Sequence, residues 1–338
     1  MSCDIVRIDP QTPDPATIER AAQILRRGGL VVFPTETVYG LGGNALDAAA
    51  VTRIFAAKGR PARNPLIVHV ADAAGARTLV SDWPDIAQRL ADAFWPGPLT
   101  LVLPKSPAVC DLVTAAGSTV AIRAPAHPAA LALLHACGLP LAAPSANSSN
   151  QLSPTRAEHV AGKITDMIDL ILDAGPTPGG LESTVLDVTC FPPRLLRPGL
   201  VTRSAIEAVI GPIEFAATAV SDQSLRSPGQ LRRHYAPNTP LEMSANSKAR
   251  VETLASQGLR VGWLTHREED VLPAVFRILL PANARDYSAH LYAAMHQLDE
   301  TGLDRIVVET PPAGDAWLAV HDRLRRASEP ESESEPEA

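Results

Sequence analysis

The sequence predicts an α/β fold with some α+β character, organised as two domains joined by a linker. The chain has 338 residues, of which 46% are hydrophobic and 20% charged, a composition typical of folded globular proteins. At about 150 residues per domain, this length fits about two domains. Amphipathic helical patterns alternate with short apolar runs, and the alternation stops in one segment rich in proline and serine. Such a rhythm predicts sheets covered by helices.

The first domain is predicted over residues 1–210. It opens with a helix that carries Ile18, Ala21 and Leu25 on one face and ends at the glycine pair 28–29, followed by a buried strand over 30–33. Apolar runs predict further strands at 66–70, 99–103, 120–123, 139–143, 170–172 and 185–188. Helical periodicity predicts helices over 48–57, 86–94, 128–136, 155–162 and 203–210.

Residues 211–245 lose this periodicity and collect proline and serine, which predicts a linker. A connection of this length is typically either a tether or a functional lid. A smaller α/β domain follows over 246–327, with strands at 260–264, 277–280 and 306–308 and helices near 287–300 and 315–326.

The last segment, 328–338, holds five glutamates and no basic residue, which predicts a disordered acidic tail. The tail supplies −5 of the net charge of −7, so the remaining chain carries only about −2. A nearly neutral body argues against a protein whose main task is to coat nucleic acid.

Neither a membrane span nor an export signal is visible in the sequence. No apolar run approaches the ~18 residues that a membrane helix needs, and the N-terminus lacks the basic and then apolar pattern of a signal peptide. We therefore expect a cytoplasmic protein without membrane association.

Several catalytic motifs are missing. The chain has no G-x-x-x-x-G-K-[ST], no G-x-S-x-G and no H-E-x-x-H, and its four cysteines form no C-x-x-C. A P-loop ATPase, a serine hydrolase and a zinc protease therefore lack support. We predict no metal site built from protein side chains, and a catalytic cysteine stays a minor alternative.

The segment 34–45 leaves the strand over 30–33 and brings hydroxyl groups together with a flexible backbone. Residues 40–45 formally match the G-x-G-x-x-A dinucleotide fingerprint. We discount a Rossmann cofactor site because no convincing acidic partner for a ribose stands about 20 residues further on. A turn rich in small residues is an equally good interpretation of this segment alone.

A cationic segment precedes the strand over 66–70. Lys58, Arg60 and Arg63 occur there without an acid, and a guanidinium beside an ammonium suits polyphosphate oxygens. A solvated surface run is the alternative. On the strand, period-two alternation places His69 on the face of Ile67. A single strand histidine is more often hydrogen-bonded than functional.

The segment 118–125 reads as an interior strand that carries Thr119, Ala121 and Arg123 on one face. An interior arginine needs an anion, which is either a structural salt-bridge partner or a ligand carboxylate.

Residues 141–155 run from a strand into hydroxyl and amide side chains that would suit a ribose, a base or a phosphate. The alternative is an ordinary loop capped by Ser153 or Thr155. Further unbalanced cations follow at 191–203 and in the linker. Cations, hydroxyls and glycines together favour electrostatic stabilisation of a phosphate-bearing reaction over covalent catalysis.

Six sequence motifs, among them the segments described above, occur in this order along the chain: PTETVYGLGGNA, KGRPARNPLIVHV, STVAIRAP, PSANSSNQLSPT, LESTV and LLRPG. Together they closely resemble the threonylcarbamoyl-AMP synthases of the YrdC-like family. The linker sequence SPGQLRRHYAP and the trailing small domain are similar to the long, two-domain form. The resemblance covers about residues 5–327.

The resemblance implies an open, twisted, mixed sheet in a YrdC-like domain, followed by the linker and a Rossmann-like α/β domain. It implies that ATP and L-threonine bind in a cationic cavity. The amine of threonine would take up carbon dioxide from bicarbonate, and the carbamate oxygen would attack the α-phosphorus of ATP with loss of pyrophosphate. A separate transferase complex would then pass the threonylcarbamoyl group to tRNAs that read codons beginning with A, and a weak direct contact with tRNA stays open.

The resemblance also implies roles for individual residues. Lys58 and Arg60 would be catalytic and would neutralise the triphosphate alongside Mg²⁺. Nucleotide contacts are implied for Lys58, Arg60, Asn64, Thr119, Ala143, Ser145, Asn147, Ser153, Arg197 and Tyr235. Threonine contacts are implied for Thr35, His69, Arg123 and Ser183, with Arg123 pairing with the amino-acid carboxylate. Tyr235 would make the linker a lid over the cavity.

The chain departs from the family pattern in places. The family's lid usually has the sequence S-P-G-M-K, whereas this chain has Gln230 and Leu231 in the last two positions. The basic contact that the family's lysine makes is therefore in doubt. We expect Arg232 to replace it. Asn150 replaces a usual glycine and tolerates a positive φ better than most residues. Two alternatives stay open: an RNA-binding module without catalysis, and an enzyme that forms a carbamoyl adenylate.

Overall fold

The structure is a computed structural model that describes residues 3–160, 162–216, 233–268, 272 and 275–329. The chain divides into two compact units. The first unit comprises Met1–Ser149 and Ser153–Gln230, and the second comprises Asn150–Leu152 and Leu231–Ala338. None of the helices in the described ranges has the length and the apolar character that crossing a bilayer requires.

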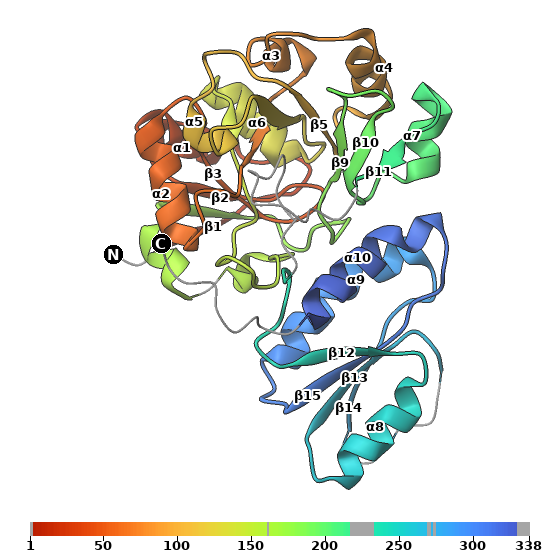
Figure 1. Ribbon diagram of the computed structural model, residues 1–338. Coiled ribbons are helices and arrows are strands. Elements are labelled where there is room, and N and C mark those ends of the chain that lie inside the picture. Colours follow the sequence, from red (N-terminus) through yellow and green to blue (C-terminus); the bar gives the residue numbers. More distant parts are fainter. Residues whose placement is uncertain (1–2, 161, 217–232, 269–271, 273–274, 330–338) are drawn as a thin grey trace. The chain divides into compact units, whose positions relative to one another are not determined.

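The described part of the first unit is built on one mixed sheet of eleven strands in the order β1-β8-β2-β3-β7-β4-β6-β5-β9-β10-β11 (Figure 1). It contains both parallel and antiparallel strand pairs, which confirms the predicted mixed sheet. The strands are β1 (Asp4–Arg7), β2 (Val31–Phe33), β3 (Gly40–Asn44), β4 (Ile67–His69), β5 (Leu99–Pro104), β6 (Thr119–Arg123), β7 (Leu141–Ala142), β8 (Leu170–Asp173), β9 (Thr184–Asp187), β10 (Arg194–Arg197) and β11 (Glu214–Phe215).

Helices cover both faces of this sheet because its strands are apolar on both faces. Val31 and Phe33 pack with helices α1 and α6, whereas Val32, between them, packs with the core that includes α2 and α4. The helices are α1 (Pro15–Arg26), α2 (Ala48–Lys58), α3 (Ala73–Arg77), α4 (Asp85–Phe94), α5 (Asp111–Thr114), α6 (Pro128–Cys137) and α7 (Arg203–Ile210), with 3₁₀ turns η1 (Ala157–His159) and η2 (Gly162–Met167).

Local sequence fixes the two ends of α2, which carries a residue of the site. The side chain of Asp47 caps the helix by accepting a hydrogen bond from the backbone N–H of Ala49 at 2.9 Å. Gly59 ends the helix in the left-handed conformation, with φ of 58°. Lys58 is therefore the last helical residue.

The glycine-rich segment after β2 is a strand, β3, and not a turn. Its glycines lie where side chains would clash. A Cβ on Gly42 would lie 2.7 Å from a ring carbon of Phe33, and one on Gly43 would lie 3.0 Å from Leu30. Glycine therefore serves close packing between neighbouring strands here.

The helix predicted over 155–162 is wrong, because only a 3₁₀ turn over Ala157–His159 forms there. An α-helix would need the carbonyl of Thr155 to accept from the N–H of His159. That carbonyl instead accepts from the N–H of Thr177 at 2.9 Å, and the N–H of His159 bonds to Arg156.

The second unit contains a parallel sheet of four described strands in the order β12-β15-β13-β14. Figure 1 shows α8 on one face of this sheet and α9 with α10 on the other, as the predicted Rossmann-like arrangement requires. The elements are β12 (Leu241–Ser244), α8 (Ser247–Ser256), β13 (Val261–Thr265), β14 (Val275–Leu279), α9 (Ala284–Asp299), β15 (Arg305–Glu309), η3 (Asp315–Trp317) and α10 (Leu318–Ser328). β11 and β12 lie inside the segment 211–245 that the composition marks as linker.

Candidate functional site

A row of side chains crosses five adjacent strands of the first unit. His69 on β4 is in register with Arg123 on β6. One step beyond the pairing of Leu101 with Ile122, the antiparallel β5 brings Thr100 opposite Arg123. Thr100 is in register with Val185 on β9, and Val185 with Arg197 on β10. Residues in register share a face, so the sheet itself aligns three of the predicted site residues.

The predicted alternation on β4 and β6 is confirmed. Ile67 and Ala121, two residues before His69 and Arg123, pack together with Val102 in a small apolar cluster on the same face. Apolar packing beside the row therefore fixes the direction in which the polar side chains point.

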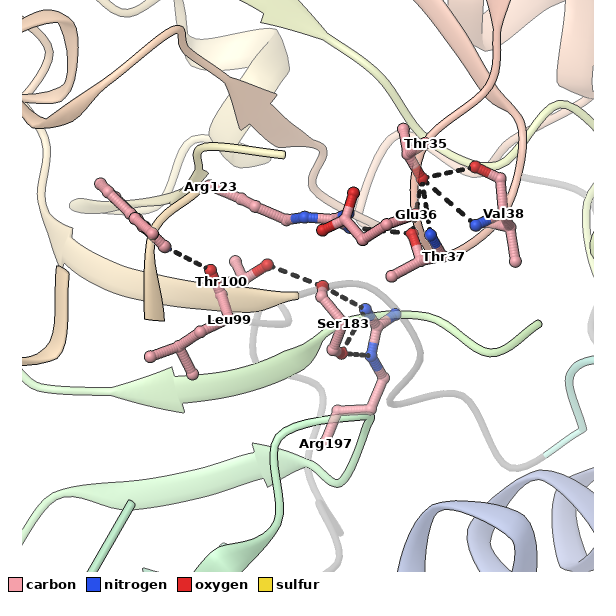
Figure 2. A network of polar contacts seen from close by, with 10 residues as sticks. Thr35, Glu36, Thr37, Val38, Leu99, Thr100, Arg123, Ser183 and Arg197 are labelled. Carbon is pink, nitrogen blue, oxygen red and sulfur yellow. Dashed lines mark hydrogen bonds and ion pairs between the residues drawn. The ribbon is translucent and has the colours of Figure 1, made fainter. Parts of the chain in front are cut away.

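Arg123 is buried and makes two polar contacts from the end of β6. One guanidinium nitrogen donates to the hydroxyl of Thr37 at 3.0 Å, and another lies 2.7 Å from a carboxylate oxygen of Glu36. Figure 2 shows the guanidinium pointing at both residues. The structural salt bridge that the sequence left open is therefore present in this structure.

Thr35 and Thr37 belong to a turn between β2 and β3. The Thr35 hydroxyl accepts from the N–H of Thr37 at 3.1 Å and from that of Val38 at 3.2 Å, and it lies 2.7 Å from the Thr37 hydroxyl. The turn thus links Thr35, a predicted threonine contact, to Arg123 through one intervening hydroxyl.

Ser183 and Arg197 meet at the other end of the row. The Ser183 hydroxyl lies 2.7 Å from that of Thr100, and Arg197 donates to the Ser183 carbonyl at 2.9 Å and to its hydroxyl at 3.2 Å. A predicted threonine contact and a predicted nucleotide contact are therefore hydrogen-bonded to each other (Figure 2).

Lys58 joins the end of α2 to the loop that follows β7. Its ammonium donates to the carbonyl of Ser145 at 2.5 Å and to the carbonyl of Asn147. Burial, with a further contribution from the nearby charge of Arg60, holds the pKa of Lys58 well below its ordinary value. Its charge is therefore sensitive to any anion that approaches it.

Arg60 is also buried, and it shapes the loop before β4. Its guanidinium donates to the carbonyl of Asn64 at 2.9 Å, to the side-chain oxygen of Asn64 at 2.7 Å and to the carbonyl of Pro65 at 2.7 Å. Nearby, the N–H of Ala143 donates to the Ile67 carbonyl at 3.0 Å. Four of the predicted nucleotide contacts thus lie on the end of α2 and on the loops before β4 and after β7: Lys58, Arg60, Asn64 and Asn147.

Three predicted residues lie away from these contacts or have other partners. Thr119 begins β6, so it lies four residues, about 13 Å along the strand, from Arg123. Ser153 donates to the Glu182 carboxylate at 2.5 Å. Tyr235 belongs to the second unit, where it is buried with Arg323 over its ring at 4.9 Å. Gln230, Leu231 and Arg232 lie outside the described residues.

His69 lies at the opposite end of the row from Arg197. Burial, together with the charge of Arg123, lowers the pKa of His69 to about 3. Its ring stands edge-on to Phe33 at 6.2 Å. The imidazole is therefore neutral near neutral pH and can serve as a hydrogen-bonding or packing group.

Sequence reasoning gave no role to Glu36, Thr37 or Thr100. The first two stand inside a motif that we singled out, but a motif does not show which side chain turns toward Arg123. Thr100 could be found only from the register between β5 and β6. In the part of the chain that the structure describes, no group of three or more metal-ligating side chains could hold a metal ion.

The comparisons with known proteins agree across both units. The family described as "Telomere recombination" matches residues 23–199, and "Threonylcarbamoyl-AMP synthase, C-terminal domain" matches residues 201–329. The chain is 46% identical to the threonylcarbamoyl-AMP synthase of Bacillus subtilis, over 94% of each chain. It is 44% identical to that of Pyrococcus abyssi, over 92% of this chain and 94% of the relative.

A solved structure is similar over almost the whole chain. The crystal structure of P. abyssi Sua5 complexed with L-threonine has a TM-score of 0.89 and 43% sequence identity, and the match covers 96% of this chain and 97% of that one. The similarity therefore extends over both units and the segment that joins them.

Proposed function

The chain belongs to the family of two-domain threonylcarbamoyl-AMP synthases, and from this premise we propose how its site carries out the reaction. The protein is a nucleotidyltransferase that converts L-threonine, bicarbonate or carbon dioxide, and ATP into threonylcarbamoyl-AMP and pyrophosphate. This is the first step of threonylcarbamoyladenosine formation in tRNAs that read codons beginning with A. The observation that best supports our site assignment is the hydrogen bond between Ser183 and Arg197, because it joins the two predicted substrate positions.

Threonine binds along the row between His69 and Ser183. The buried guanidinium of Arg123 takes the amino-acid carboxylate, for which a planar pair of N–H donors is suited. Thr35 and Ser183 supply hydroxyl groups on either side. His69, held neutral by its lowered pKa, contributes packing or one hydrogen bond without adding a charge.

ATP binds over the loops that Lys58 and Arg60 hold together. Both cations balance the triphosphate, and Arg197 reaches it from β10. The nucleotide position is lined by Asn64, Ala143, Ser145, Asn147 and Ser153. Thr119 contacts the nucleotide at the end of this position that is farthest from Arg123. Lys58 and Arg60 would share the neutralisation of the triphosphate with Mg²⁺, which would supply further positive charge there.

The chemistry needs positioning and charge balance and no covalent side-chain intermediate. A carbamate oxygen formed on threonine attacks the α-phosphorus in line, and pyrophosphate leaves on the opposite side. Lys58 and Arg60 stabilise the charge that develops on the phosphates, which is the main contribution a protein makes to such a displacement.

The product is a labile adenylate that requires an acceptor. We propose that the chain works in the cytoplasm, where it passes threonylcarbamoyl-AMP to a tRNA transferase complex. We also propose that Tyr235 and the linker cover the nucleotide during the reaction.

Pyrophosphate release from ATP, Mg²⁺ and bicarbonate tests this proposal. We expect release with L-threonine, little with L-serine, and loss of the threonine-dependent rate in Lys58→Ala. Stimulation by carbamoyl phosphate in place of threonine would instead indicate a carbamoyl-adenylate enzyme. Salt-sensitive tRNA binding that ignores threonine would indicate an RNA-binding module.

A further inference from the structure

We propose that Glu36 is the residue that binds the α-ammonium group of threonine, and that in the free protein it holds the place of the substrate carboxylate on Arg123. This inference rests on the proposed function. It assigns a role to a residue that neither the motif analysis nor the hydrogen bonds of the row had required.

The first observation is the ion pair itself. The Glu36 carboxylate lies 2.7 Å from the Arg123 guanidinium, with 12% and 4% of the two side chains exposed. A buried arginine needs an anion at all times, because an uncompensated buried charge is strongly destabilising. Glu36 meets this need only until a substrate carboxylate arrives at the same guanidinium.

The second observation is that the Glu36 carboxylate is short of hydrogen-bond donors. Among the described residues, neither of its buried oxygens accepts a hydrogen bond, although one makes the ion pair. The buried carboxylate Glu182 differs, since it accepts a hydrogen bond from the Ser153 hydroxyl at 2.5 Å. A buried carboxylate is normally well supplied with donors, and an ammonium group brings three.

The third observation is that hydrogen bonds anchor the backbone around Glu36, whereas its side chain is held by the ion pair with Arg123. The N–H of Gly179 donates to the Glu36 carbonyl at 2.9 Å. On either side, the Thr35 hydroxyl accepts from the N–H groups of Thr37 and Val38. Rotation of the side chain alone can therefore open the ion pair while the turn keeps its shape.

An α-amino acid zwitterion matches this arrangement. Its carboxylate and its ammonium group, inserted between Arg123 and Glu36, replace one ion pair by two and leave the buried site neutral. A ligand with only a carboxylate would take Arg123 from Glu36 and leave the Glu36 carboxylate without a cation. A ligand with only an ammonium group would likewise leave Arg123 without an anion. The geometry therefore favours an amino acid over a simple carboxylate.

Calorimetric binding to the full chain tests the proposal. The probes are L-threonine and the matched hydroxy acid, 2,3-dihydroxybutanoate, in which a hydroxyl replaces the amine. We expect the wild-type chain to prefer threonine by at least about tenfold, the ratio that corresponds to one lost ion-pair contact. Equal affinities in the wild-type chain would overturn the proposal without any variant.

The variant Glu36→Gln keeps the shape and removes the charge. We expect it to lose most of the preference for threonine, while its affinity for the hydroxy acid stays the same or rises. Glu36→Asp keeps the charge and should retain part of the preference. The matched control is Glu207→Gln, which removes the carboxylate that pairs with Arg203 on α7 and should change neither affinity.

Two kinds of failure can be told apart. If the wild-type chain releases no pyrophosphate with threonine, the proposed function is wrong. If the wild-type chain is active and a folded Glu36→Gln keeps its full preference for threonine over the hydroxy acid, only the role of Glu36 is wrong.

Discussion

Two buried cations of the site, Lys58 and Arg123, are balanced in different ways. Arg123 has a carboxylate partner, Glu36, at 2.7 Å. Lys58 has only carbonyl oxygens as described hydrogen-bond partners and a lowered pKa. The charge on Lys58 therefore depends on what binds next to it.

ATP binding should accordingly be coupled to protonation of Lys58. The triphosphate favours the ammonium form, so the pKa of Lys58 should rise on binding, and the complex should take up a proton at any pH between the free and the bound pKa. Calorimetry in buffers of different ionisation enthalpy measures this uptake. The uptake should disappear in Lys58→Met; persistence of the full uptake in that variant would contradict the assignment.

His69 should make stability depend on pH. Its pKa is about 3 in the folded chain and about 6.5 in an unfolded chain, so between these values the unfolded state binds the extra proton. Stability should therefore fall as pH falls through this window, by at most about 1.4 kcal/mol per pH unit. Denaturant unfolding at several pH values should give a flatter profile for His69→Gln.

A matched control for this prediction is His290→Gln, since His290 is an exposed histidine on α9. This variant should keep the wild-type slope. If His69→Gln and the wild-type chain had the same slope, the buried imidazole would not be neutral as we describe.

At the scale of elements, close packing between β10 and the start of β9 holds Arg197 on Ser183. A Cβ on Gly199 would lie 2.2 Å from the backbone nitrogen of Thr184 and 2.4 Å from the carbonyl carbon of Ser183. These contacts are with backbone, which cannot move aside as a flexible side chain can. Gly199 thus permits the contact between the two predicted substrate positions.

Gly199→Ala should therefore weaken both substrate sites at once. We expect a loss of about 1–3 kcal/mol of stability from the forced displacement, and lower affinity for threonine and for ATP together. Thermal unfolding and calorimetry measure the two effects. Gly75→Ala on α3 is the control, because its Cβ would make only ordinary contacts, at 3.6 Å or more; equal behaviour of the two variants would refute the argument.

Helices and strands could be predicted from the sequence where their own residues carry the pattern. Helices such as Ala48–Lys58 and strands such as Thr119–Arg123 carry their own periodicity, so they were predicted to within a residue or two. β3 was not predicted, because its glycines are explained by Phe33 and Leu30 on other segments. The row of side chains across β4, β6, β5, β9 and β10 depends on how neighbouring strands pair. The alternation of residues within one strand does not reveal that pairing.

At the scale of the whole molecule, a short piece of the catalytic half belongs to the second unit. Asn150–Leu152 groups with the second unit, although Asn147 and Ser153, on either side, are predicted nucleotide contacts. The N–H of Ala236 donates to the Asn150 carbonyl at 3.0 Å, next to Tyr235. The positive φ expected of Asn150 is confirmed, at 67°.

The proposed role of Tyr235 as part of a lid can be tested by substitution. Its own φ is 59°, unusual for a large side chain, and its buried ring lies under Arg323 and beside Tyr292. We expect Tyr235→Ala to lower ATP affinity, because the proposed lid would lose its aromatic cover. Phe276→Ala, at an exposed position on β14, is the control, and unchanged ATP affinity in Tyr235→Ala would count against the lid.

The central claim, that one row of side chains joins a threonine position to a nucleotide position, is tested most directly by detecting the product itself. The measurement is the transfer of labelled carbon from bicarbonate into an adenylate, with L-threonine, ATP and Mg²⁺, in the wild-type chain and in Arg123→Gln. We predict labelled threonylcarbamoyl-AMP from the wild-type chain and a large loss in the variant. A folded wild-type chain that forms no labelled adenylate, or an Arg123→Gln variant that forms it at the wild-type rate, would contradict the account.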